Sequence, residues 1–208
     1  MTRIKLLLFY LICIGPENFF KILKSNIYEK RIIYYFELSF DKIKFIKPRV
    51  KSESKIFYSF DELPSFLKAK IKKNLGYEKL RIFKYRLSAT IKLVVSFVDG
   101  EFASYCFLAC SEEQFSLFRL RKNDIYFFDC FTFLEFRGLG LIYNETKYAI
   151  DIFKKHGYLR ACVAIDSYNT DSICAFNKVG FYKTKEYRVR KIFFIKKIFV
   201  KNLFYKDL

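Results

Sequence analysis

The sequence predicts an α/β (α+β) fold with a mixed, mostly antiparallel central sheet of about six or seven strands, flanked by helices. Three observations support this class. Runs of branched and aromatic residues recur along the chain, an Asp-Gly pair joins two of them, and in the second half such runs alternate with amphipathic stretches. Helices that lie between strands in the sequence are typical of a sheet covered by helices.

Six stretches are predicted to be strands. The clearest pair is 90–98 and 101–109, because Asp99-Gly100 between them is a dipeptide that a type I′ hairpin turn prefers. The stretch 124–134 is almost wholly apolar, so we expect it in the middle of the sheet with both faces buried. The other three strands are expected at 31–40, at 158–165 and from Gly180 onward.

Helices are predicted where apolar residues recur at helical spacing: 62–73, the stretch from Gly140 to His156-Gly157, and 171–178. Residues 1–30 are expected to form two helices separated at Gly15-Pro16. We expect them to dock on the protein rather than to act as a signal or membrane anchor, because their run of nine apolar residues is too short to span a bilayer.

The predicted organisation is an N-terminal part, residues 1–60, that contains helices and the first strand and packs on a core domain, residues 61–208. The C-terminal stretch 191–208 alternates apolar residues with lysines. We expect it to add the last strand and a basic terminal helix, and the alternative is a cationic amphipathic segment that touches anionic lipid.

The net charge is +18, which favours anionic partners. No run of five or six cations is present, so no nucleic acid is expected, and the basic termini suggest at most weak contact with a membrane surface. The six cysteines form no CxxC pair, and the single histidine, His156, cannot complete a zinc pattern. We therefore expect no metal, reduced structural cysteines and a cytoplasmic protein.

A glycine-containing loop follows the apolar strand directly: Arg137-Gly138-Leu139-Gly140-Leu141, and then a helix. Glycines let the main chain turn tightly near a ligand, and a helix N-terminus presents unpaired N–H groups to an anion. The loop is not a Walker sequence, and it is not GxGxxG because Tyr143 stands where the third glycine would be. The pattern predicts a phosphate-binding loop.

A second motif lies downstream: Asn169, Ser172, Ala175, Phe176, and then Lys178-Val179-Gly180-Phe181. Together with the glycine loop, this resembles the GNAT superfamily of N-acetyltransferases over about residues 85–190. In that family the phosphate loop runs Arg/Gln-x-x-Gly-x-Gly/Ala after the fourth core strand. This sequence departs from the pattern at Ile142, where the family has Gly or Ala, and at Phe176, which is often a Tyr that protonates the leaving thiolate.

The resemblance implies transfer of an acetyl group from acetyl-CoA, as cosubstrate, to an amine on a small molecule or sugar. It places the pyrophosphate on backbone N–H groups of the loop and the pantetheine arm beside the end of the apolar strand. The implied cofactor-binding residues are Thr132, Arg137, Gly138, Leu139, Gly140, Leu141, Ile142, Asn169 and Phe176.

The catalytic groups are less clearly indicated. Tyr168 or solvent would supply the proton that Phe176 cannot, and Asp129 is the candidate general base, with Asp124 and Asp166 as alternatives. His156 is interpreted as a helix-end residue. Two further hypotheses stay open: a catalytically degenerate protein that binds acyl-CoA without turnover, and a basic protein that binds membrane surfaces or nucleic acid.

Overall fold

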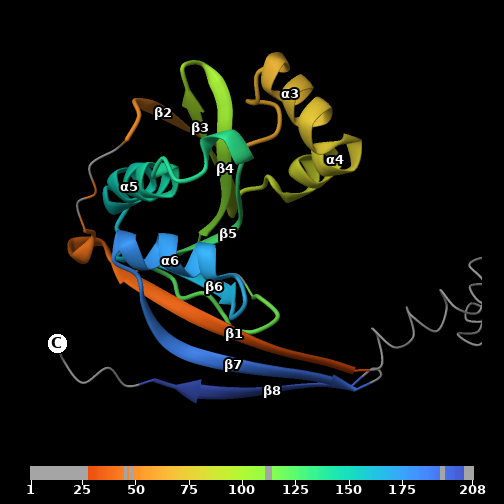
Figure 1. Cartoon of the computed structure of the whole chain (residues 1–208), viewed down its shortest axis with the longest axis vertical. Helices are drawn as coiled ribbons and strands as arrows, with labels where there is room; N and C mark the ends of the chain where they lie inside the picture. The colour runs from red at the N-terminus through yellow and green to blue at the C-terminus, as the bar shows by residue number, and fades with distance from the viewer. Residues whose placement is uncertain (1–27, 45, 47–48, 111–113, 193–194, 204–208) are drawn as a thin grey trace, which may run out of the picture.

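The computed structural model describes residues 28–44, 46, 49–110, 114–192 and 195–203. The helices predicted over residues 1–30 lie outside this part, except that Tyr28 to Lys30 belong to a strand. A single sheet of eight strands, in the order β2-β3-β4-β5-β6-β1-β7-β8, runs through the molecule (Figure 1). It is mixed and mostly antiparallel, which confirms the predicted class with one or two strands more than expected.

The strands are β1 (Tyr28–Ser39), β2 (Ser52–Phe57), β3 (Ile91–Val98), β4 (Glu101–Cys110), β5 (Asp124–Thr132), β6 (Arg160–Asp166), β7 (Tyr182–Ile192) and β8 (Ile195–Asn202). The helices are α3 (Ser65–Leu75), α4 (Tyr77–Arg86), α5 (Leu141–Lys154) and α6 (Thr170–Val179), with short 3-10 turns at Phe40–Lys42 and Leu134–Phe136.

The helices cover opposite faces of the sheet. Helices α5 and α6 pack on one face against apolar side chains of β1, β5 and β6, such as Phe36, Phe127 and Val163. Helices α3 and α4 pack on the other face, where Leu67 and Phe83 meet β3 and β4. The loop before β5 extends this second layer across β1, β6 and β7.

Strand β1 lies in the sheet among strands from the C-terminal half of the chain. Strand β1 lies between β6 and β7 and is antiparallel to both, so the N-terminal half of the protein completes the sheet of the C-terminal half. The β3–β4 hairpin closes through Asp99 (φ 49°) and Gly100 (φ 78°), both in the left-handed region, as the Asp-Gly signal predicts.

Three elements differ from the sequence prediction. Strand β2 was missed because its Ser-Glu-Ser-Lys start is polar, as suits a strand at the sheet edge. Helix α4 was missed because, of its ten residues, only Phe83 is buried. The basic terminal helix predicted within 191–208 is wrong for the described residues, since Ile195–Asn202 forms β8. Its branched and aromatic residues favour a strand that pairs with β7.

The cysteines also differ in part from expectation. A disulfide joins Cys106 on β4 to Cys130 on β5, whereas the sequence predicts six reduced cysteines. The two strands are neighbours at this point, with 4.0 Å between the two Cα atoms. Cys110 and Cys162 are free and buried, and burial raises the pKa of both thiols to about 12, which makes them unreactive packing residues as predicted.

Candidate active site

The sheet divides where β5 leaves β6. The two strands are parallel and pair only from Asp124–Arg160 to Phe127–Val163. Beyond that point β5 continues to Thr132 along β4, while β6 continues to Asp166 along β1 (Figure 1). Because strand edges carry a row of N–H and C=O groups, the divergent ends offer main-chain partners to a ligand with amide groups of its own.

A bulge in β5 assists this divergence. Asp129 has a φ of 46°, which is rare for a residue with a side chain, and the register between β4 and β5 shifts between Tyr105 and Phe107. A bulge bends its strand and increases the local twist. The end of β5, including the predicted ligand-binding residue Thr132, is thereby turned away from β6.

The glycine loop links this strand end to α5. Gly138 (φ 76°) and Gly140 (φ 84°) are both in the left-handed region, and Gly140 is the N-cap residue of α5. A Cβ atom at either glycine would meet no heavy atom within 4 Å. The glycines are therefore required for backbone conformation and leave open space above the loop, as an anion-binding turn needs.

The start of α5 is held firmly on both sides of the loop. Tyr143 and Asn144 donate their N–H groups to the Gly140 carbonyl, and Leu141 is buried against β3 and β4. The first-turn N–H groups of Leu141 and Ile142 point along the helix axis toward the loop, where the positive end of the helix dipole also lies. Arg137 closes the other side by donating from Nε to the Thr132 carbonyl at 3.2 Å.

The second motif forms the start and the inner face of α6. Asn169 is the N-cap of this helix, and its Oδ1 accepts the N–H of Ser172 at 3.2 Å. Phe176 is buried and packs edge-on against Phe127 of β5 and Phe181. The motif residues thus place α6 beside the inner edge of β5, while Tyr168, just before the helix, is 74% exposed.

The three candidate carboxylates all form ion pairs. Asp129 accepts from Lys79 at 2.9 Å and from Arg86, both on α4. Asp124 is buried and held by the Arg160 guanidinium at 2.9 Å, and Asp166 accepts two bonds from Arg31. Each of these carboxylates is engaged by a cation from another strand or helix, an arrangement that fixes these elements relative to one another.

The structure also shows a wholly buried acid that the sequence pattern did not single out. Glu145 on α5 lies wholly inside the protein, where Ser104 of β4 donates to its carboxyl at 2.5 Å. Burial raises the pKa of Glu145 to about 8, although hydrogen bonds from Ser104 and Ser96 act in the opposite direction. Its spacing offered a signal: Glu145 stands four residues before Ala149, on the predicted apolar side of the helix.

Two features were sought in the described part of the chain: a cluster of metal-binding side chains and a helix that could span a membrane. This part contains no group of three or more His, Cys, Asp or Glu side chains arranged to hold a metal ion. None of its helices combines the length and the apolar character needed to cross a bilayer.

Comparison with solved structures gives the fold a family. The chain superimposes on a GCN5-related glucosamine N-acetyltransferase region of a fungal β-N-acetylglucosaminidase (TM-score 0.55, 12% identity, 84% of this chain and 22% of that one). It superimposes on a tandem GNAT protein of clavulanic acid biosynthesis (0.53, 12%, 93% and 60%). It also superimposes on a GNAT-family acetyltransferase from Colwellia psychrerythraea with a TM-score of 0.52 and 12% identity. That match covers 84% of this chain and 60% of the other.

The protein therefore has the GNAT acetyltransferase fold. No family model matches the sequence, and a search of curated proteins gives no match. The chain spans about 60% of the length of two of these structural relatives and about a fifth of the third.

Proposed function

We propose that the protein transfers an acetyl group from acetyl-CoA to an amine on a small molecule. The proposal depends on two features at the carboxyl ends of the central strands. They are the divergence of β5 from β6 and the Gly138–Gly140 loop at the start of α5. The divergent strands suit an extended arm with amide groups, and the loop suits a pyrophosphate. Acetyl-CoA contains a pyrophosphate followed by such an arm.

In this proposal the loop residues 137–142 bind the pyrophosphate, chiefly through backbone N–H groups. Main-chain groups near Thr132 hold the thioester carbonyl and the arm, and Asn169 and Phe176 border the outgoing arm. The amine then attacks the thioester carbon, a C–N bond forms, the C–S bond breaks, and the sulfur takes a proton. Tyr168 is the proposed donor of that proton, with water as the alternative.

We assign Asp129 a positioning role in preference to that of general base. Both its oxygens accept from Lys79, and one also accepts from Arg86, so the side chain connects α4 to the bulge of β5. The amine would then lose its proton to water or enter as the free base. The sequence-based hypothesis that Asp129 acts as a base remains a prediction that the same experiment tests.

A pair of variants tests the chemistry, with release of free thiol from acetyl-CoA measured over a panel of amines. If Tyr168 donates the proton, Tyr168→Phe lowers turnover by about 10²-fold or more, while Tyr182→Phe, also an exposed tyrosine, leaves it unchanged. Loss of turnover in Asp129→Asn but not in Lys79→Gln would restore Asp129 as the base.

A second candidate function is binding of acyl-CoA without turnover. Two observations favour it: the family's usual proton donor position holds Phe176, which is buried in an apolar cluster, and the candidate bases are ion-paired. Calorimetric binding of acetyl-CoA with no thiol release from any amine would establish this function in place of acetyl transfer.

A further inference from the structure

A band of cations lies on one face of the three strands at the far edge of the sheet. Side chains at every second position of a strand share a face, and residues in register lie side by side. The register places Lys30 of β1 opposite Arg190 of β7, which lies opposite Lys197 of β8. Two residues along, Arg188 lies opposite Phe199, and then Glu186 lies opposite Lys201.

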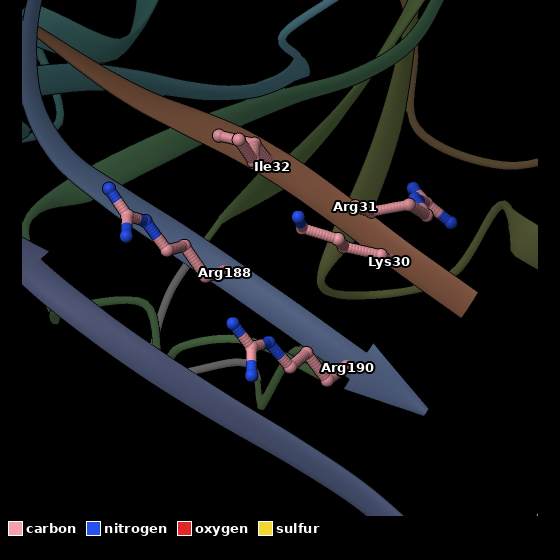
Figure 2. A pocket seen from close by; sticks show the side chains of 5 residues that line it. All are labelled: Lys30, Arg31, Ile32, Arg188 and Arg190. Carbon is pink, nitrogen blue, oxygen red and sulfur yellow. The ribbon is translucent and has the colours of Figure 1, made fainter. Parts of the chain in front are cut away.

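The side chains of β7 alternate between the two faces from Tyr187 to Arg190. Tyr187 and Val189 are buried against the second layer, whereas Arg188 and Arg190 are exposed. Figure 2 shows Lys30, Arg188 and Arg190 projecting to the same side of the strands, while Arg31 points to the other side, where it is bound to Asp166. We call the set Lys30, Arg188, Arg190, Lys197 and Lys201 the cationic face.

The cationic face has a shallow hollow and a strong excess of positive charge. Lys30, Arg31, Ile32, Arg188 and Arg190 line a hollow of about 260 Å³ (Figure 2). Among the described residues on this side of β1, β7 and β8, Glu186 is the one acid, and it accepts from Arg188 Nε at 2.7 Å. Five cations against one acid select a ligand with several negative charges.

The spacing of these cations suits a chain of phosphates. Neighbouring strands lie about 4.8 Å apart and alternate residues of one strand about 6.7 Å apart, so the cations form a band rather than a point. Arginine guanidinium groups bind phosphate oxygens through two parallel N–H donors. A single phosphate would use one or two of these side chains, whereas a strand of nucleic acid would use all five.

One aromatic side chain distinguishes this surface from a membrane-binding one. Phe199 is 52% exposed, lies opposite Arg188 and has the Arg190 guanidinium 5.8 Å from its ring centre. Val200, which is also exposed, is opposite Tyr187 and therefore on the reverse face. Among the described side chains of this face, Phe199 is the one large apolar group that is exposed. A ring beside arginines offers a stacking surface for a base, whereas membrane insertion needs a broader apolar area.

We propose that the cationic face binds a single-stranded nucleic acid, with the phosphates on Lys30, Arg188, Arg190, Lys197 and Lys201 and one base stacked on Phe199. This differs from the expectation that no nucleic acid binds, which rested on the absence of a run of cations in the sequence. The strand register places Lys30 beside four cations that lie between positions 188 and 201. The proposal is independent of acetyl transfer, since the glycine loop lies on other elements.

The test measures binding of a fluorescein-labelled 20-nucleotide oligo(U) by anisotropy between about 50 and 200 mM salt. Three phosphate contacts are removed together in Lys30→Gln/Arg188→Gln/Arg190→Gln. The slope of log K against log salt should become shallower by about 2, because each phosphate contact on a single strand contributes about 0.7. Phe199→Ala should weaken binding about tenfold with the salt slope unchanged.

The matched control removes three exposed lysines elsewhere, in Lys73→Gln/Lys84→Gln/Lys122→Gln, with the same change in net charge. It should leave both affinity and slope nearly unaltered. Equal losses in both triple variants would show that diffuse charge binds the oligonucleotide, and would overturn the proposal. So would the absence of binding at 50 mM salt.

Vesicles of phosphatidylserine and phosphatidylcholine provide the remaining arm. Vesicle binding that depends on Lys30, Arg188 and Arg190, with no binding of oligo(U), would overturn the proposal in favour of a membrane surface. Thermal unfolding of each variant checks that the exposed glutamines leave the fold intact, and acetyl-CoA affinity should be the same in both triple variants.

Discussion

Two regions of this protein are suited to phosphate, and they are built in opposite ways. The loop before α5 offers backbone N–H groups, a helix terminus and two glycines in the left-handed region, with Arg137 as its one cationic side chain. The cationic face offers five Lys and Arg side chains on a regular sheet. The loop depends on backbone conformation at single residues, whereas the face depends on the sum of its charges.

This difference decides how each region responds to change. A site made of main-chain dipoles tolerates salt and loses its function when one glycine acquires a charged side chain. A site made of exposed cations loses affinity steadily with salt and with each substitution. The net charge of +18 is thus informative about the cationic face and says little about the loop.

The largest effect is expected from Gly140→Asp. The carboxylate would lie beside the pyrophosphate, where repulsion of about 4 kcal/mol at 4 Å corresponds to roughly a thousand-fold loss of acetyl-CoA affinity. Gly140→Asn is the matched control, because asparagine has the same shape, tolerates a positive φ and carries no charge. We expect calorimetry to show a much smaller loss for Asn. Equal affinities in Asp, Asn and the parent protein would contradict the loop assignment.

The next largest effect is expected on stability, through the proton on Glu145. This side chain connects α5 to β4 through its hydrogen bond with Ser104. Its folded-state pKa of about 8 is above its ordinary value of 4.5, so the folded protein keeps a proton that the unfolded chain has lost. This contribution to stability is complete below about pH 4.5 and is lost as the pH rises through 8. The slope is about 1.4 kcal/mol per pH unit for one proton.

Chemical denaturation at pH 6 and pH 8 therefore separates the parent protein from Glu145→Gln. The parent should lose about 2 kcal/mol more than the variant between these two values, since glutamine has no proton to release. Glu53→Gln, at an exposed glutamate of β2, should behave like the parent.

Much of the fold could be predicted because local pattern and tertiary position agree. The structure contains three elements that the sequence pattern predicts: the turn at Asp99-Gly100, the buried strand β5 and the helix after Gly140. The polar strand β2 and the helix α4 could not be found, since their sequences lack the periodic apolar residues on which such predictions rest. Both lie at the periphery, where few side chains are buried.

The conformation of the glycine loop was predictable because backbone geometry there depends on residue type, as at Gly138 and Gly140. The catalytic side chains were not, because ion pairing depends on residues distant in sequence. Asp129 meets Lys79 and Arg86 from a helix that sequence periodicity did not reveal, and Glu145 meets serines of two other strands. The cationic face was missed because the alternating lysines within 191–208 were assigned to a terminal helix, and because Lys30 comes from the other end of the chain.

Salt should distinguish directly between the two proposed phosphate-binding regions. If five phosphates contact the cationic face, raising salt from about 50 to 200 mM should weaken oligo(U) binding by about 100-fold. Acetyl-CoA affinity at the loop should fall only a few-fold over the same range, since dipoles contribute most of that binding. A steep salt dependence of acetyl-CoA binding would show that the loop also relies on side-chain charge.

The smallest effect is expected at Asp129, which combines both designs: a strained backbone position and a charge pair. Its carboxylate holds Lys79 and Arg86, and the Arg86 guanidinium also lies 5.2 Å from the ring centre of Phe107. All three side chains are between a quarter and a third exposed, so screening reduces the energy of the pairs. Asp129→Asn keeps the side-chain shape and tolerates the positive φ, so only the charge pairing is lost. We expect a loss of about 1 kcal/mol in unfolding free energy and almost no change in acetyl-CoA affinity.

Asp151→Asn breaks an exposed pair within α5 and should cost less than about 0.5 kcal/mol. If Asp129→Asn instead left stability equal to that of Asp151→Asn, the bridge from α4 to the bulge of β5 would have no part in positioning that helix.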